Sequence, residues 1–350
     1  MRGMMRVILR SLTVGILIGV TGGGSGPAKA GDEELPVLLR SLRPVETPAP
    51  PFENGRFEPA QGETIAFIGG TNTFDQDRHG FLESRFHLAW PRKNLKLRNL
   101  AWQGDVLTYQ ARPRYFYTEK GDTQPGSVPD SRERTEPGIL FIDFGKMESL
   151  PGGTWTIEAY REMIEQLSTR TRRLVLVAPT PFFPVGPAKA ETEARNERLA
   201  EVVADIGKVA TENDALFVDL FTPFRTSLEA GFSHDGIHLT ESGHRAVADE
   251  IAKQLNFPKS PKPDTSPDLS QSLRQAIDRK NRLWQQYYRP TNWAFLFGDR
   301  QHVPASRDPV ERSERWFLRE IDSLPALIAE TEADIHRYAG EMAAQNASNQ

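Results

Sequence analysis

The fold is decided by residues 174–219, which begin with LVLVA (174–178) and end with ALFVD (215–219). Pro179 ends the first of these short apolar runs. Between the runs, segment 188–211 places its apolar residues on one face of a helix. A strand, a helix and a second strand in this order predict a parallel β-α-β unit.

The same alternation extends to both sides of this unit. Further strands are predicted at TIAFI (64–68), at 95–100 and at GILFIDF (138–144). Helical spacing of apolar residues predicts further helices at about 80–90, 156–169 and 241–255. Five short apolar strands separated by helices predict a five-stranded parallel sheet covered on both faces, a three-layer α/β/α sandwich. Ligands of such sheets bind beyond the carboxyl ends of the strands.

The first thirty residues have the pattern of a secretory signal peptide. They combine basic residues (Arg2, Arg6 and Arg10), an apolar run of nine residues (12–20) and a small-x-small site (28–30). We expect cleavage at about Ala30 and export to the periplasm or the extracellular space. The apolar run is shorter than the roughly 20 residues that span a bilayer, so no stable membrane anchor is expected after cleavage.

Composition limits the partners. Residues 1–30 contain four basic and no acidic residues, so the remaining chain has 39 basic and 47 acidic residues and a net charge of −8. This balance argues against nucleic acid as a partner. The chain has no cysteine, which excludes disulfides, a thiolate nucleophile and cysteine-based metal sites. The spacing of His79 and His87 does not suit a metal pair, and we predict neither a metal nor another cofactor.

The remaining segments suggest one α/β domain with additions at both ends and in the middle. A long polar stretch with Pro and Gly at 113–137 is expected to be a surface insertion. The C-terminal part has an aromatic block at 284–297 and a helix predicted over about 309–339. The predicted organisation is a signal peptide (1–30), an extended leader (31–60), an α/β domain (61–256), a proline-rich linker (257–268) and an aromatic-rich helical C-terminal extension (269–350).

The sequence DGIHLT (235–240) follows the last predicted strand. An Asp three residues before a His can hold one ring nitrogen while the other faces a nucleophile. Asp235 and His238 are therefore candidate catalytic residues, and Thr240 is a plausible N-cap for the helix that follows. His244, inside that helix, is expected on its surface.

Four segments together resemble the conserved blocks of the SGNH hydrolases, the GDSL-type lipases and esterases. They are IGGTN (68–72), NLAWQGD (99–105), FGKMES (144–149) and DGIH (235–238), and the resemblance covers roughly residues 62–256. It implies the flavodoxin-like fold of that family. It also implies that Thr71 is the nucleophile, that Asp235 and His238 assist it, and that the backbone N–H groups of Thr71 and Gly104 form an oxyanion hole.

Two blocks depart from the family pattern. Thr71 stands where the family has serine, and its extra methyl group restricts the side chain and crowds the attack. Met147 stands where the family has an asparagine that donates to the oxyanion, and methionine has no such donor. Lys146, Asn72 or Gln103 could replace that donor if the fold brings one of them near.

The resulting hypothesis is an exported esterase that acts on a small acyl ester or an acylated glycan. The alternative is a catalytically impaired relative that binds a glycan or a protein partner in the same cleft. Acyl transfer to an acceptor other than water would use the same residues. The sequence does not identify the substrate, a protein partner or the oligomeric state.

Overall fold

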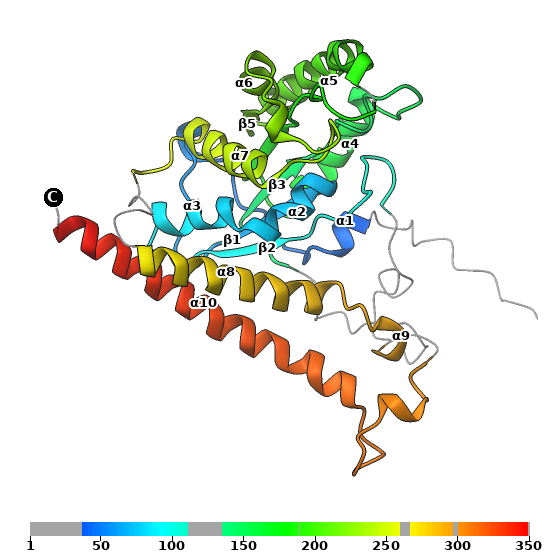
Figure 1. Cartoon of the computed structure of the whole chain (residues 1–350), viewed down its shortest axis with the longest axis vertical. Coiled ribbons are helices and arrows are strands. Elements are labelled where there is room, and N and C mark those ends of the chain that lie inside the picture. The colour runs from blue at the N-terminus through cyan, green and yellow to red at the C-terminus, as the bar shows by residue number, and fades with distance from the viewer. Residues whose placement is uncertain (1–36, 111–134, 188, 260–266, 297–299, 349–350) are drawn as a thin grey trace, which may run out of the picture. The chain divides into compact units, whose positions relative to one another are not determined.

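The computed structural model describes residues 37–110, 135–187, 189–259, 267–296 and 300–348. Within these ranges, five parallel strands form one sheet in the order β2-β1-β3-β4-β5 (Figure 1). The strands are β1 (Thr64–Gly69), β2 (Lys96–Asn99), β3 (Ile139–Asp143), β4 (Leu174–Ala178) and β5 (Leu216–Asp219). This is the flavodoxin-like strand order, and it confirms the predicted fold class.

Helices cover both faces of the sheet. Helices α4 (Ile157–Ser168) and α5 (Thr192–Glu212) lie on one face, and α3 (Phe81–Ala89) and α7 (Glu241–Gln254) lie on the other. Successive strand residues point to opposite faces. In β3, Leu140 and Ile142 therefore pack in the core under α4 and α5, whereas Phe141 packs in the core under α3 and α7. The short helix α6 (Phe221–Thr226) follows β5.

One helix near the predicted site was not expected. After the first strand the sequence predicts a helix only at about 80–90, but helix α2 (Thr71–His79) starts directly at the end of β1. Gly80, with φ of +61°, separates α2 from α3. The structure thus places Thr71 at the first turn of a helix.

The described part of the leader packs on the domain. It contains α1 (Val37–Arg40) and the short 3-10 helix η1 (Glu53–Gly55), and its side chains Leu38, Leu42 and Phe57 are buried. The predicted signal peptide and most of the predicted 113–137 insertion lie outside the described residues. Over the ranges that are described, no helix combines the length and apolar character needed to cross a membrane.

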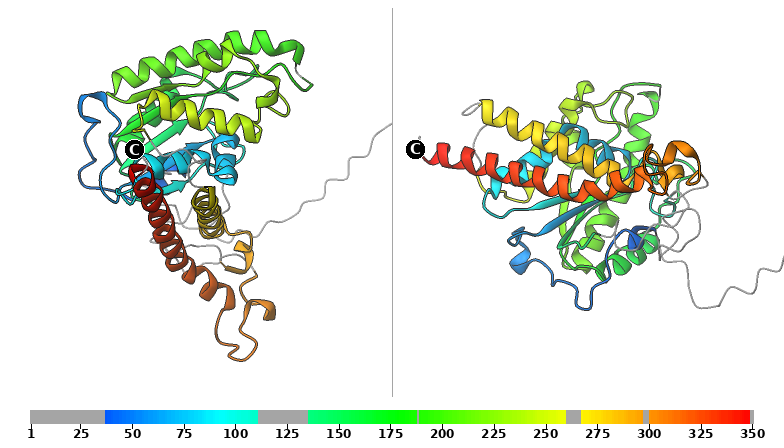
Figure 2. Two further views of the ribbon diagram at one scale, coloured as in Figure 1. Left: turned by 60° about the vertical axis from the view of Figure 1, so that its left-hand side comes forward. Right: turned by 90° about the horizontal axis from the view of Figure 1, so that it is seen from below.

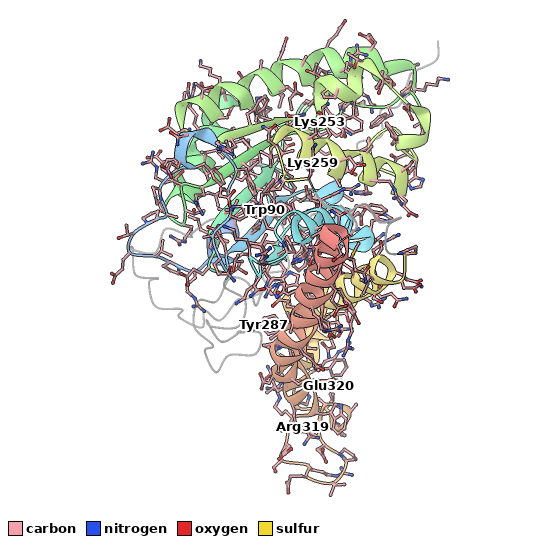
Figure 3. All side chains as sticks on the ribbon, turned by 90° about the vertical axis from the view of Figure 1, so that its left-hand side faces the viewer. Trp90, Lys253, Lys259, Tyr287, Arg319 and Glu320 are labelled. Carbon is pink, nitrogen blue, oxygen red and sulfur yellow. The ribbon has the colours of Figure 1, made fainter. Side chains whose placement is uncertain are left out.

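The C-terminal extension consists of α8 (Pro267–Tyr288), α9 (Trp293–Leu296) and α10 (Trp316–Ser348). Helices α8 and α10 run along each other (Figures 1 and 2). Helix α8 was not predicted, and α10 begins and ends later in the chain than the expected 309–339. Tyr287 packs against the core on the α4–α5 face, whereas Arg319 and Glu320 near the start of α10 are exposed (Figure 3). The boundaries 61–256 and 269–350 remain a prediction.

Candidate active site

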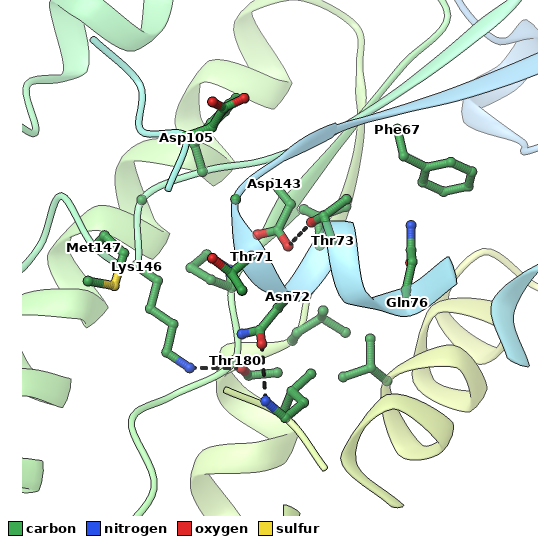
Figure 4. A pocket seen from close by; sticks show the side chains of 18 of the residues that line it. Phe67, Thr71, Asn72, Thr73, Gln76, Asp105, Asp143, Lys146, Met147 and Thr180 are labelled. Carbon is green, nitrogen blue, oxygen red and sulfur yellow. Dashed lines mark hydrogen bonds between the residues drawn. The ribbon is translucent and has the colours of Figure 1, made fainter. Parts of the chain in front are cut away.

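A cavity of about 220 Å³ lies where the sequence predicted the site, at the carboxyl ends of the central strands. Thr71, Gly104, Met147 and His238 all line it, although they come from four separate segments of the chain (Figure 4 shows part of this lining). Asp235 does not line the cavity and contacts it through His238. The structure therefore brings together all five residues that the sequence singled out.

Asp235 and His238 form a directly hydrogen-bonded pair. Asp235 Oδ2 lies 2.7 Å from His238 Nδ1, and Asp235 Oδ1 accepts the backbone N–H groups of Ile237 at 2.9 Å and His238 at 2.8 Å. Partial burial raises the pKa of Asp235, but the hydrogen bonds from His238 and Ile237 outweigh it and lower that pKa to about 2. An ionised carboxylate can only accept, so Nδ1 carries the proton and Nε2 is left as a hydrogen-bond acceptor.

Two side chains from other parts of the chain hold this loop at Ile237. Asn72 donates to the Ile237 carbonyl at 3.1 Å and accepts the Leu239 N–H at 3.1 Å. Lys146 Nζ lies 3.1 Å from the same Ile237 carbonyl oxygen. At the far end of the loop, the Thr240 hydroxyl accepts the Gly243 N–H at 3.1 Å, which confirms the predicted N-cap of α7. The loop is thus fixed on both sides of His238.

Thr71 owes its position to the glycine pair before it. Gly69 has φ of +159°, and a Cβ there would come within 2.6 Å of the Asp143 carbonyl oxygen and 2.7 Å of Thr73 Oγ1. Only glycine allows β1 to turn this closely into α2. No side chain caps the first turn of α2. Its free N–H groups and its helix dipole therefore favour negative charge beside Thr71.

Gly104 supplies the second backbone group at the site. It has φ of +81°, which favours glycine, and its N–H donates to Thr71 Oγ1 at 3.4 Å. Among the described residues, the Thr71 hydroxyl makes this hydrogen bond and none to His238. The bond between nucleophile and base often tightens only when substrate binds.

Met147 occupies the third predicted oxyanion position and leaves it without a side-chain donor. Its side chain is 42% exposed and lines the cavity. The backbone around it is held by Glu148, whose carboxylate accepts the N–H groups of Leu107 at 2.6 Å and Gly145 at 2.9 Å. These hydrogen bonds hold the backbone of the loop in place, although Met147 offers no side-chain donor.

None of the three candidate replacements supplies that donor. The amide of Asn72 donates to Ile237, as described above. Lys146 Nζ is directed to three oxygens, those of Thr180 at 3.2 Å, Pro181 at 3.1 Å and Ile237 at 3.1 Å. Gln103 lies on the surface. The candidate oxyanion donors are therefore the backbone N–H groups of Thr71 and Gly104.

Asp143 and Lys146 are buried beside the site, which was not predicted from the sequence. Burial raises the pKa of Asp143 to about 6, against the lowering effect of a 2.8 Å hydrogen bond from Thr73. Burial also lowers the pKa of Lys146 to about 7, against the raising effects of Asp143 and Asp235. Both line the cavity. Their location depends on long-range packing that no local pattern indicates.

His244 on the inner wall of the cavity differs from the sequence prediction. His244 was expected on the surface of α7, but its side chain is 5% exposed, lines the cavity and has its ring 5.0 Å from that of His79. Burial, followed by the proximity of His79, lowers the pKa of His244 to about 3, so its imidazole is neutral. The neighbouring lining side chains are mostly apolar and include Phe67, Phe141 and Ile251.

The comparison with protein families identifies the chain. The model of the GDSL-like lipase/acylhydrolase family matches residues 69–246. This stretch contains all four sequence blocks except residue 68 of the first, and it covers half of the chain. The chain belongs to this family and is a hydrolase of the class that acts on ester bonds. No curated protein matches the chain.

Several solved structures are similar to part of the chain. A catalytic mutant of Axe2, an acetylxylan esterase from Geobacillus stearothermophilus, is 15% identical over 57% of this chain and 97% of its own, with a TM-score of 0.43. LAE5, an α/β hydrolase from the metagenome of Lake Arreo, is 16% identical over 57% and 98%, with a TM-score of 0.41.

A gut microbial diltiazem-metabolizing enzyme is 18% identical over 58% of this chain and 49% of its own, with a TM-score of 0.41. The chain thus spans about half the length of that enzyme.

Proposed function

We propose that this chain is an exported esterase that cleaves a small acyl ester by acyl transfer through Thr71, with His238 as the base. The observation that carries the proposal is the Asp235–His238 pair, joined at 2.7 Å on the same cavity as Thr71 and Gly104. A purely binding site would not need an oriented, ionised carboxylate behind an imidazole. Family membership supports the reaction class.

In the first half of the reaction, Thr71 Oγ1 attacks the ester carbonyl carbon and His238 Nε2 takes the hydroxyl proton. Asp235 keeps Nδ1 protonated and stabilises the imidazolium that forms. The tetrahedral intermediate then collapses, the C–O bond to the alcohol breaks, and His238 returns the proton to that alcohol. The acyl group remains on Thr71.

Water completes the cycle by the same steps, with His238 as base and then as acid. In both halves, negative charge develops on the former carbonyl oxygen. The N–H groups of Thr71 and Gly104 would stabilise it. The Gly104 N–H, which now makes only a 3.4 Å contact to Thr71 Oγ1, would shift to the substrate oxygen.

The cavity supports a small acyl group. Its volume of about 220 Å³ is below the range of roughly 300–1,000 Å³ that is usual for drug-sized ligands. We therefore propose an acetyl or similarly short acyl ester, with the alcohol part of the substrate outside the cavity. An acetylated glycan is one substrate class that fits this arrangement, because the sugar would stay in solvent.

Export is proposed from the signal-peptide pattern of residues 1–30. Expression of the full chain in a Gram-negative host, followed by fractionation and N-terminal sequencing, tests it. We expect a mature protein in the periplasm that begins at about residue 31. An uncleaved protein in the cytoplasm would contradict export without affecting the catalytic proposal.

The catalytic proposal is tested by measuring the hydrolysis of p-nitrophenyl acetate and an acetylated polysaccharide. The variants are Thr71→Ala and His238→Ala, and Ser242→Ala serves as a matched control on the neighbouring helix. We expect activity in the parent and the control and none above background in the two site variants. Absence of activity in the parent on both substrates would contradict the proposal and favour a binding role.

A further inference from the structure

The C-terminal extension covers the open edge of the sheet. Strand β2 is an edge strand. The backbone groups of its even-numbered residues point toward β1, because the Lys96 N–H donates to the Glu63 carbonyl at 3.0 Å and the Leu100 N–H, just after the strand, donates to the Phe67 carbonyl at 2.8 Å. In a parallel strand the backbone groups alternate between the two sides. The carbonyls of Leu95, Leu97 and Asn99 therefore point away from the sheet, where an uncovered edge would expose them.

Side chains of α8 and α10 satisfy this row of carbonyls from one end to the other. His336 of α10 donates to the Leu95 carbonyl at 2.9 Å, and Lys280 of α8 donates to the Leu97 carbonyl at 3.3 Å. Trp284 donates to the Asn99 carbonyl at 2.9 Å. The extension thus replaces a sixth strand with hydrogen bonds from side chains.

A fourth side chain of the extension, Arg289, contacts the chain beyond the end of β2. Arg289, one residue after α8, donates to the Asn99 carbonyl at 3.1 Å and to the Ala101 carbonyl. The guanidinium lies between aromatic rings, 4.6 Å from the centroid of Phe74 and 5.3 Å from that of Trp102. Since β2 ends at Asn99, the Ala101 contact holds a loop and not the sheet.

That loop leads directly to Gly104. The Asn99 side chain accepts the Ala101 N–H at 2.9 Å and donates to the Thr73 carbonyl of α2 at 2.7 Å. Trp102 N–H donates to the Gly69 carbonyl at 3.3 Å. The segment that carries the Gly104 N–H is therefore fastened to β1 and α2 on one side and to Arg289 on the other.

We propose that Arg289 is a positioning residue for the oxyanion hole, through which the C-terminal extension holds the Gly104 N–H in place. The proposal rests on the proposed function, since it assigns Gly104 the role given there. Arg289 does not touch the substrate in this account. It acts only through the carbonyls of Asn99 and Ala101.

The size of the effect follows from the cost of a misplaced donor. Loss of one oxyanion donor lowers turnover by roughly 10²–10³-fold, and a displacement of about 1 Å can cost roughly 10²-fold. Arg289→Met keeps an apolar stem among the rings but removes both hydrogen bonds. We expect it to lower kcat about 10- to 100-fold with little change in KM.

Two further variants separate positioning from general stability. Arg289→Lys keeps one charged donor and should recover part of the lost kcat. His336→Phe removes the cap at the other end of the same row, so it should lower the melting temperature while the folded protein keeps the kcat of the parent. Equal losses of kcat in Arg289→Met and His336→Phe would overturn the proposal.

Hydrogen–deuterium exchange gives a readout that does not need activity. Arg289→Met should speed exchange in a peptide covering 100–107 and leave a peptide covering 139–143 unchanged, whereas His336→Phe should affect only residues near Leu95. Unchanged exchange over 100–107 in Arg289→Met would overturn the proposal. An inactive parent that shows the expected exchange would contradict the proposed function and leave the positioning contact supported.

Discussion

Substitution of Met147 by asparagine should raise activity. The oxyanion hole proposed here has two backbone donors, from Thr71 and Gly104, and Met147 lines the same cavity without a donor. One donor is worth roughly 10²–10³-fold in turnover when it is screened from water. Because the Met147 side chain is 42% exposed, water competes for the new amide, and we expect a gain near the low end, about 10²-fold.

The substitution should leave the fold intact. The backbone of this loop is held by Glu148 through its hydrogen bonds to Leu107 and Gly145 and does not depend on the methionine side chain. A change at an exposed position such as this usually alters stability by less than about 0.5 kcal/mol. Thermal unfolding of the variant and the parent checks this before the kinetics are compared.

The assay is steady-state hydrolysis of p-nitrophenyl acetate by the parent, Met147→Asn and the isosteric control Met147→Leu. The gain should appear in kcat, because the donor acts on charge that develops in the transition state. It should disappear when Thr71→Ala is added. An equal gain in Met147→Leu, or no gain in a folded Met147→Asn, would refute the assignment of this position to the oxyanion hole.

Three further outcomes are expected. Asp235→Asn should lower kcat by up to about 10⁴-fold with little effect on KM, measured with the same ester, because the amide no longer stabilises the His238 imidazolium; a KM effect alone would contradict this. Asn72→Leu should lower kcat about tenfold, because it removes the hydrogen bonds of Asn72 to the Ile237 carbonyl and the Leu239 N–H on either side of His238. Faster hydrogen exchange over 235–240 should accompany the loss. Because the pKa of Lys146 is lowered, above about pH 7 the unfolded chain keeps the Lys146 proton while the folded chain has lost it. The free energy of unfolding should therefore rise by up to about 1.4 kcal/mol per pH unit above pH 7. Urea unfolding at pH 7 to 9 should show this slope in the parent and a weaker one in Lys146→Met.

The strands could be predicted because their signal is local. Residues such as Leu140 and Val175 belong to continuous apolar runs, as expected for strands buried on both faces. Helix α2 could not be predicted in this way, because the segment from Thr71 to His79 contains one large apolar residue and no side-chain cap. It forms where the glycine pair ends β1, and its position comes from packing with its neighbours.

Helix α8 was missed for a different reason. Its buried face includes Lys280 and Asn281, which are 2% and 3% exposed and which interrupt the apolar periodicity. Lys280 is accommodated by Glu83, whose carboxylate lies 2.8 Å away, and by the Leu97 carbonyl. Both partners lie nearly 200 residues away in sequence, so the pairing that allows a buried lysine is not visible in the segment itself.

In the candidate site, too, the local contacts could be predicted from the sequence and the long-range contacts could not. Asp235 and His238 could be chosen from their spacing, because the hydrogen bond between them is local. The contacts of Asn72 and Lys146 with the Ile237 carbonyl span 165 and 91 residues, and they could not be derived without the fold. These contacts also show why neither residue replaces the donor missing at Met147.

The central claim is that Thr71 carries the acyl group, and the most direct measurement is the site of acylation. The purified protein is mixed with p-nitrophenyl acetate, quenched in acid and analysed by intact mass and peptide mapping. We expect one added acetyl group on the peptide that contains Thr71 and no adduct on that peptide in Thr71→Ala. The acetylated fraction of the protein should increase in a variant with slower deacylation. Acetylation at another residue, with turnover that survives Thr71→Ala but not His238→Ala, would contradict the account by placing the nucleophile elsewhere.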